Sequence, residues 1–83
     1  MLFARNRIRD LREDNDFTQQ QVAEVLDISA RKYSYIERDI MEPSKEMLVT
    51  LAEFYKTSVD YLLGLTDVKE PYPKGRRWGD LYL

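Results

Sequence analysis

Four side chains between positions 29 and 38 could contact nucleic acid, because their spacing would place them on one side of a helix. They lie at i, i+3, i+4 and i+7, which are neighbouring positions on a helical surface, and they are Arg31, Ser34, Tyr35 and Arg38. They offer guanidinium groups, hydroxyls and an aromatic ring without a carboxylate. Donors of this kind fit the base edges in a DNA major groove. From these residues alone, an ordinary solvated helix face is an equal alternative.

The other side of the same stretch is predicted to face a core. Tyr33, Ile36 and Glu37 lie at i, i+3 and i+4, so a helix would turn all three inward. A buried carboxylate needs a cation, and Arg12 falls four residues after Ile8, on the inner side of an expected first helix. We therefore expect an Arg12–Glu37 salt bridge. The alternative is that both side chains reach water independently.

Capping signals predict that another helix directly precedes this one. Thr18 and Gln21 have the spacing of a capping box, which would begin the earlier helix. Ser29 would cap the later one. The turn between them, residues 26–28, is only about three residues long, which is the length found in a helix-turn-helix.

Apolar periodicity predicts three more helices around this pair. The first would cover residues 4–14, with inner positions Ala4, Ile8 and Leu11 and outer positions Arg5, Arg7 and Arg9. The fourth would follow a Ser44 cap, and its inner stripe would be Met47, Leu48, Leu51, Ala52 and Tyr55. A short fifth helix, 59–63, would follow Ser58 and end at Gly64. The expected fold class is therefore all-α.

Two stretches of the chain resemble one known family. They are TQQQVAEVLDISARKYSYIE, residues 18–37, and PSKEMLVTLAEFYKTSVDYLLG, residues 43–64. Both are similar to the phage-repressor-type helix-turn-helix family, of the Cro/repressor or xenobiotic-response-element (XRE) type, and the resemblance covers residues 5–67. It implies a five-helix repressor-like DNA-binding domain in which the helix 29–38 reads the major groove. It also implies the Arg12–Glu37 pair and a phosphate contact from Gln19, which could otherwise be a solvated residue at a helix start.

Two places depart from the pattern of that family. Asp27 stands where the family usually has glycine, at a turn position with positive φ. A non-glycine residue in this left-handed conformation costs of the order of 1 kcal/mol. After the helix 29–38, Asp39 and Glu42 lie where glycine and basic residues are frequent, so we expect fewer phosphate contacts and a modest affinity for DNA. Ile40 and Met41 in the same loop are expected to cover an edge of the core. Contact with another protein is the alternative.

The composition excludes several classes of function. Without cysteine and histidine, the chain has no thiolate nucleophile, no imidazole base and no plausible zinc site, so no metal or other cofactor is expected. Its scattered carboxylates do not assemble an enzyme active site. A net charge of −2 argues against non-specific coating of nucleic acid, although basic residues cluster at 5–12, 31–38 and 74–77. No apolar run approaches the roughly 20 residues of a membrane span, and the start lacks a signal peptide, so a cytoplasmic protein is expected.

Helical periodicity stops at Leu65, which predicts a DNA-binding domain over residues 1–67 and an irregular C-terminal tail over 68–83. The tail contains prolines and glycines, and it also holds Tyr72, Trp78, Leu81 and Tyr82. Disordered tails usually lack aromatic residues, so this one is expected to pack against its own domain, a second copy or another molecule. Packing across a two-fold axis would hold two reading helices about one DNA turn, roughly 34 Å, apart.

The expected function is sequence-specific binding of double-stranded operator DNA by a transcriptional repressor that forms a homodimer. Arg31 would read a guanine edge, and Ser34 and Tyr35 would read neighbouring bases. Phosphate contacts, which position a protein without specifying sequence, would come from Gln19, Lys32 and Arg38. The alternative is an antitoxin-like or adaptor module in which the same fold binds another protein, as the acidic loop and the aromatic tail would allow.

Overall fold

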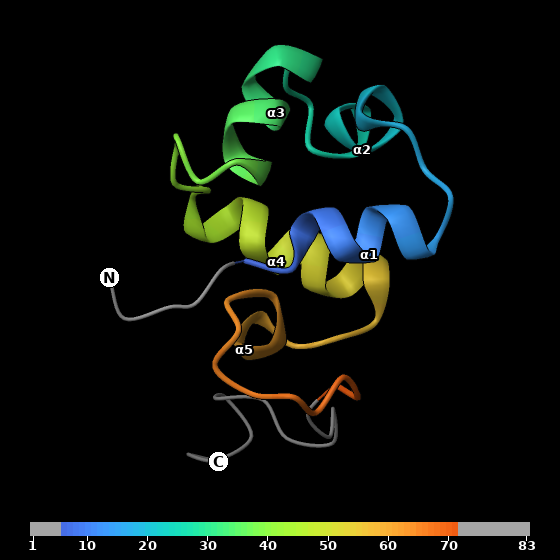
Figure 1. Cartoon of the computed structure of the whole chain (residues 1–83), viewed down its shortest axis with the longest axis vertical. Coiled ribbons are helices and arrows are strands. Elements are labelled where there is room, and N and C mark those ends of the chain that lie inside the picture. The colour runs from blue at the N-terminus through green and yellow to red at the C-terminus, as the bar shows by residue number, and fades with distance from the viewer. Residues whose placement is uncertain (1–5, 72–83) are drawn as a thin grey trace, which may run out of the picture.

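Five short helices make up the part of the chain that the structure describes, residues 6–71 of the 83 in a computed structural model (Figure 1). They are α1 (Ile8–Asp14), α2 (Gln19–Val25), α3 (Ala30–Glu37), α4 (Lys45–Tyr55) and α5 (Val59–Leu62). This stretch contains no strand, so the five-helix, all-α prediction is confirmed. Figure 1 shows α1 and α4 across the middle of the molecule, with α2 and α3 on one side and α5 on the other. No helix within residues 6–71 has the length and apolar character needed to cross a membrane.

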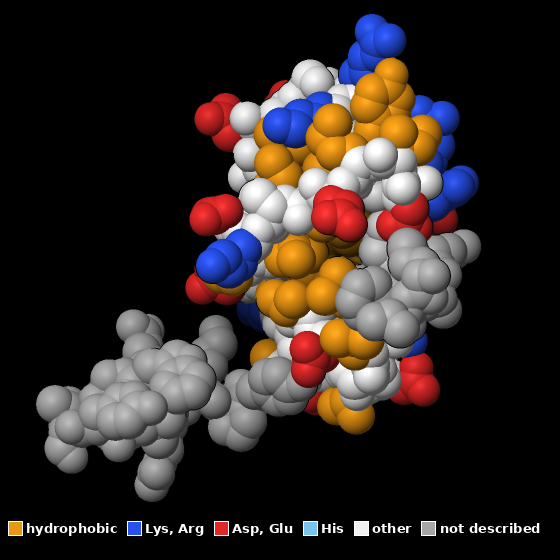
Figure 2. All heavy atoms as spheres, turned by 90° about the vertical axis from the view of Figure 1, so that its left-hand side faces the viewer, with side chains coloured by type: hydrophobic (Ala, Val, Ile, Leu, Met, Phe, Trp, Pro, Cys, Tyr) orange, Lys and Arg blue, Asp and Glu red, His pale blue; other side chains and the backbone are white. Residues whose placement is uncertain are grey.

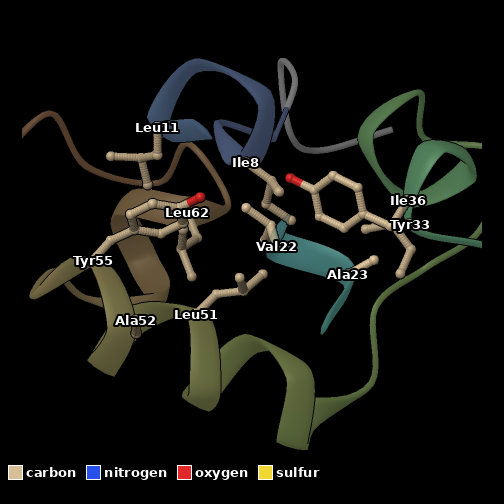
Figure 3. Close-up of a cluster of buried hydrophobic side chains, with 10 residues drawn as sticks. All are labelled: Ile8, Leu11, Val22, Ala23, Tyr33, Ile36, Leu51, Ala52, Tyr55 and Leu62. Atoms are coloured by element: carbon tan, nitrogen blue, oxygen red, sulfur yellow. The ribbon is translucent and has the colours of Figure 1, made fainter. Parts of the chain in front are cut away.

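All five helices contribute to one hydrophobic core (Figure 3). Helices of 4–11 residues are too short to be stable alone, so burial of shared apolar surface holds them together. Met47 and Leu48, which the periodicity puts in the core, are partly buried at its margin. The buried core residues are Ile8, Leu11, Val22, Ala23, Tyr33, Ile36, Leu51, Ala52, Tyr55 and Leu62.

Side-chain caps begin four of the helices at the predicted residues. Thr18 Oγ1 accepts a hydrogen bond from the Gln21 N–H at 3.1 Å, and the Gln21 side chain accepts one from the Thr18 N–H at 2.8 Å, which completes the capping box. Ser29, Ser44 and Ser58 each accept a hydrogen bond from the backbone N–H three residues on. A cap of this kind stabilises a helix by about 1 kcal/mol.

Residues with left-handed backbone follow several of the helices. Asp27 has φ 58° in the turn between α2 and α3, as predicted. Asp16, Asp39 and Lys56 also have positive φ, from 55° to 59°, which the sequence pattern did not predict. Aspartate enters this region more readily than most residues because its short polar side chain can hydrogen-bond locally. Gly64, with φ 77°, follows the end of α5 as predicted.

Helix α1 begins at Ile8 and not at residue 4, so the predicted start of this helix is wrong. The reason is Asn6, whose side-chain Oδ1 accepts a hydrogen bond from the Ile8 N–H at 3.1 Å, in the manner of a helix cap. Asn6 Nδ2 donates to the Ile36 carbonyl at 3.1 Å and to Asp39 Oδ1 at 2.6 Å. The backbone before Ile8 is therefore attached to the end of α3.

Arg7 does not lie on an outer face of α1, contrary to the prediction. Its guanidinium lies over the Tyr61 ring, 4.4 Å from the centroid, and it donates to the Thr66 carbonyl. The same group forms an ion pair with Asp67 at 2.7 Å, and the Arg7 side chain is 23% exposed. Arg7 thus connects the start of α1 with the segment that follows α5.

The segment after α5 remains in contact with the helical domain past residue 67, the predicted end of the DNA-binding domain. The Thr57 hydroxyl donates a hydrogen bond to the carbonyl of Lys69. The tail residues predicted to pack and the first predicted positions of α1 lie outside the described residues; they are Tyr72, Trp78, Leu81, Tyr82, Ala4 and Arg5. Packing of the tail across a two-fold axis stays a prediction.

Candidate nucleic-acid interface

A short bonded turn sets the direction in which α3 leaves α2. The backbone N–H groups of Asp27 and Ile28 donate to the carbonyls of Glu24 and Ala23 at 3.1 and 3.0 Å. These bonds satisfy carbonyls in the last turn of α2, which have no hydrogen-bond partners within the helix itself. Ser29 then caps α3 directly. The two helices and this turn form a helix-turn-helix.

The inner side of α3 is anchored by both apolar packing and an ion pair. Tyr33 and Ile36 have no exposed surface, and Glu37 is 7% exposed. Arg12 Nε lies 2.6 Å from Glu37 Oε2, and Arg12 Nη2 lies 3.3 Å from Oε1, so the guanidinium binds both carboxylate oxygens. Arg12 Nη1 also donates to the Phe17 carbonyl at 3.0 Å. The salt bridge expected from the sequence is present, and it joins α1 to α3.

Gln19, the first residue of α2, also contacts this carboxylate. Its Nε2 donates to Glu37 Oε1 at 3.1 Å, a contact that the sequence pattern did not indicate. An amide nitrogen carries two hydrogens, so one remains for a phosphate oxygen. The backbone N–H groups of a helix start also suit an anion. Glu37 therefore holds Gln19 in one orientation beside α3, and the phosphate contact of Gln19 stays a prediction.

Hydrogen bonding keeps Glu37 charged despite its burial. Burial raises the pKa of Glu37, but hydrogen bonding, chiefly from Arg12, outweighs burial and holds that pKa below the ordinary value. The hydrogen bond to Glu37 likewise raises the pKa of Arg12. Burial raises the pKa of Tyr33, and the Glu37 carboxylate adds to this effect. At neutral pH this site is an ion pair next to a neutral tyrosine.

The outer side of α3 presents Tyr35 between two arginines. Arg31 Nε donates to the Tyr35 hydroxyl at 3.0 Å, and the Arg31 Cζ lies 5.9 Å from the ring centroid. Arg38 Cζ lies 5.3 Å from the same centroid. Both distances are within the range of cation–π attraction. The structure thus brings Arg31, Tyr35 and Arg38 together, and their i, i+4 and i+7 spacing was the signal that could have predicted these contacts.

The predicted DNA-contacting residues differ in their exposure. Arg31, Lys32 and Arg38 are exposed, whereas Gln19, Ser34 and Tyr35 are partly buried. Figure 2 shows Lys and Arg side chains gathered at the upper end of the molecule, where Figure 1 places α3. The basic face expected from the charge pattern therefore includes α3, on a chain of net charge −2.

The loop between α3 and α4 differs from its predicted role. Ile40 is 63% exposed and Met41 is 37% exposed, so the expectation that Ile40 covers an edge of the core is wrong. Asp39, just before these two residues, has a left-handed backbone, and its carboxylate accepts a hydrogen bond from Asn6 Nδ2 at 2.6 Å. Beside this loop is a cavity of about 270 Å³, lined by Asn6, Asp39, Met41, Glu42, Pro43, Leu48 and Leu63.

Comparison with known families agrees with this geometry. Residues 8–62 match the family described as helix-turn-helix, and the chain belongs to that family. The phage-repressor-type resemblance seen in residues 18–37 and 43–64 is thereby confirmed. The matched range begins and ends with the five helices of the structure.

Several proteins of Bacillus subtilis strain 168 are similar to the chain. An uncharacterized HTH-type transcriptional regulator, YobD, is 42% identical over 71 residues, which is 86% of this chain and 62% of YobD. The HTH-type transcriptional regulator ImmR is 36% identical over 64 residues, 77% of this chain and 50% of ImmR. The HTH-type transcriptional regulator AnsR is 32% identical over 69 residues, 83% of this chain and 60% of AnsR. The chain therefore spans between half and two thirds of the length of these relatives. No solved structure matches it.

Proposed function

We propose that the chain binds operator DNA sequence-specifically and regulates transcription as a repressor. The observation that carries this proposal is the outer side of α3, where the exposed Arg31 and Arg38 both lie against the partly buried Tyr35. This side belongs to the second helix of a capped helix-turn-helix, and a buried ion pair anchors the opposite side of the same helix. A helix held in this way can enter a major groove without losing its shape. The relatives named as transcriptional regulators support the same function.

Each candidate residue has a role that suits its chemistry. Arg31 would bind the O6 and N7 atoms of a guanine, and Ser34 and Tyr35 would lie against neighbouring bases. Lys32 and Arg38 would neutralise phosphates, and Gln19 would donate to one. The protein would act in the cytoplasm as a homodimer, with one α3 in each half-site of a two-fold operator. This role requires no catalysis.

Selection of binding sites from random duplex DNA tests the proposal. The wild-type protein should enrich one sequence, and its affinity should fall with rising salt, because each neutralised phosphate adds about 0.9 to the slope of log K against log salt. Arg31→Ala and Tyr35→Ala should remove discrimination between the selected site and random DNA while the fold is kept. Lys45→Ala, which changes an exposed charge at the start of α4, is the matched control. Recovery of no enriched sequence would refute the proposal.

Binding of another protein is the second candidate function. The observation that favours it is the exposure of Ile40 and Met41 next to a cavity lined partly by apolar side chains. Figure 2 shows hydrophobic side chains on this face of the molecule. If selection recovers no DNA sequence, Ile40→Lys should then reduce binding to a protein partner without changing stability.

A further inference from the structure

The hydrogen bond between Arg31 and Tyr35 limits how Arg31 can approach a base. A guanidinium has five N–H groups, one on Nε and four on the two terminal nitrogens. In this structure the Nε hydrogen is donated to the Tyr35 hydroxyl at 3.0 Å. The four hydrogens on the terminal nitrogens remain for other acceptors. Arg31 can therefore present its end, and not its Nε side, to a partner.

The end of a guanidinium matches one base edge better than the others. Guanine shows two acceptors, O6 and N7, in the major groove, whereas adenine shows one acceptor beside a donor. Two parallel N–H groups on a planar group fit the guanine pair. A long arginine side chain normally loses rotamer freedom on binding. The Arg31–Tyr35 hydrogen bond already orders the arginine before DNA binds, which reduces that loss.

Tyr35 is itself held on both sides. The Arg31 and Arg38 guanidinium carbons lie 5.9 and 5.3 Å from its ring centroid. Its hydroxyl accepts from Arg31, so the hydroxyl hydrogen is available to a phosphate or to a base acceptor next to the guanine. Removing the hydroxyl would leave both guanidinium–ring contacts in place and would free the Nε hydrogen of Arg31.

We propose that Tyr35 is a positioning residue that orients Arg31, so that the two side chains read one guanine as a coupled pair. This inference rests on the proposed function, because it assumes that α3 enters the major groove. It differs from independent reading, in which Arg31 and Tyr35 would each specify a separate base pair.

Competition binding on the selected operator distinguishes the two arrangements. With coupled reading, Tyr35→Phe lowers the preference for guanine over adenine at the Arg31 position by roughly fivefold to tenfold. Arg31→Ala removes that preference, and the double variant Arg31→Ala/Tyr35→Phe discriminates no worse than Arg31→Ala. Replacing this guanine with 7-deazaguanine, which lacks the N7 acceptor, weakens wild-type binding more than binding by Tyr35→Phe, and leaves Arg31→Ala unaffected.

Tyr61→Phe is the matched control. Tyr61 also lies under an arginine, Arg7, at 4.4 Å, but it belongs to α5 and not to the reading helix. This variant should keep wild-type discrimination at every position. Thermal unfolding of Tyr35→Phe should match the wild type, since the bond that it removes is exposed.

Three results would overturn the inference. Tyr35→Phe could keep wild-type discrimination, it could lose discrimination at a different base pair, or 7-deazaguanine could weaken its binding as much as it weakens wild-type binding. A wild-type protein that selects no sequence would instead refute the proposed function, and the inference with it. The outcomes are distinct because the first three require a selected operator.

Discussion

Replacing Arg12 with alanine removes the cation from a carboxylate that cannot reach water. The Arg12 and Glu37 side chains are 13% and 2% exposed, and N–O distances of 2.6 and 3.3 Å join them. After the replacement, the neutral Gln19 amide would still contact Glu37, but the charge would be uncompensated. Breaking a buried pair in this way costs about 3–5 kcal/mol. Since small domains are stable by about 5–15 kcal/mol, Arg12→Ala should lose a large share of its stability.

Urea unfolding followed by circular dichroism measures this loss. Glu37→Ala should be similarly unstable, whereas the double variant should lose less than the sum of the two, because it leaves no unpaired charge. Arg9→Ala is the control, since the Arg9–Glu13 ion pair, at 3.3 Å, has side chains that are 59% and 52% exposed. Its loss should stay within about 0.5 kcal/mol. Additive losses in the cycle would show that Arg12 and Glu37 do not stabilise each other.

The same ion pair predicts how stability depends on pH. The pKa of Glu37 is lower in the folded protein than its ordinary value of 4.5, so the unfolded chain takes up the proton at a higher pH. The stabilisation is then complete above the unfolded pKa and is lost as pH falls through the folded pKa. Glu37→Gln should flatten the acid side of the stability curve. An unchanged acid limb in this variant would contradict the assignment.

Three further predictions address the turn, the phosphate contacts and the end of the chain. Asp27→Gly should raise the free energy of unfolding by up to about 1 kcal/mol, because it relieves the strain of a left-handed backbone at aspartate. A lower melting temperature would mean that the Asp27 side chain forms a bond that stabilises the turn by more than this strain. Gln19→Ala should weaken binding to all DNA sequences without changing the salt slope, whereas Lys32→Ala should reduce the slope by about 0.9, because only the lysine displaces a counterion. Equal slopes in both variants would remove Lys32 from the phosphate contacts. Truncation after Pro71 should leave a folded monomer with weaker operator binding, and light scattering that still shows a dimer would assign the interface to the helices.

Contacts within one helical turn could be predicted because they depend on spacing alone. Thr18 and Gln21 form the capping box that their three-residue separation indicates. Ser29 caps α3 for the same reason, and the inward direction of Glu37 follows from its position relative to Tyr33 and Ile36. The Arg12 partner was predictable because an inward carboxylate and an inward guanidinium each need the other.

Contacts between distant segments could not be predicted in the same way. Asn6 bonds to Ile36 and Asp39, and Arg7 bonds to Asp67, which are 30, 33 and 60 residues away in the chain. Helical periodicity places Arg7 among several outer arginines, because the spacing of residues contains no information about the segment after α5 that packs beside Arg7. The exposed Ile40 directly follows Asp39, which Asn6 binds, and helical spacing carries no information about this loop either.

The contacts of Arg7 also fix the place at which the chain leaves the helical domain. Its contacts with the Thr66 carbonyl and Asp67 hold the segment after α5 at the end of the molecule opposite α3 (Figure 1). A polypeptide joined after Pro71 would therefore begin on the far side from a bound duplex. A fluorescent or affinity fusion placed there would leave the reading helix unobstructed, whereas the same fusion inserted in the loop before α4 would lie beside it.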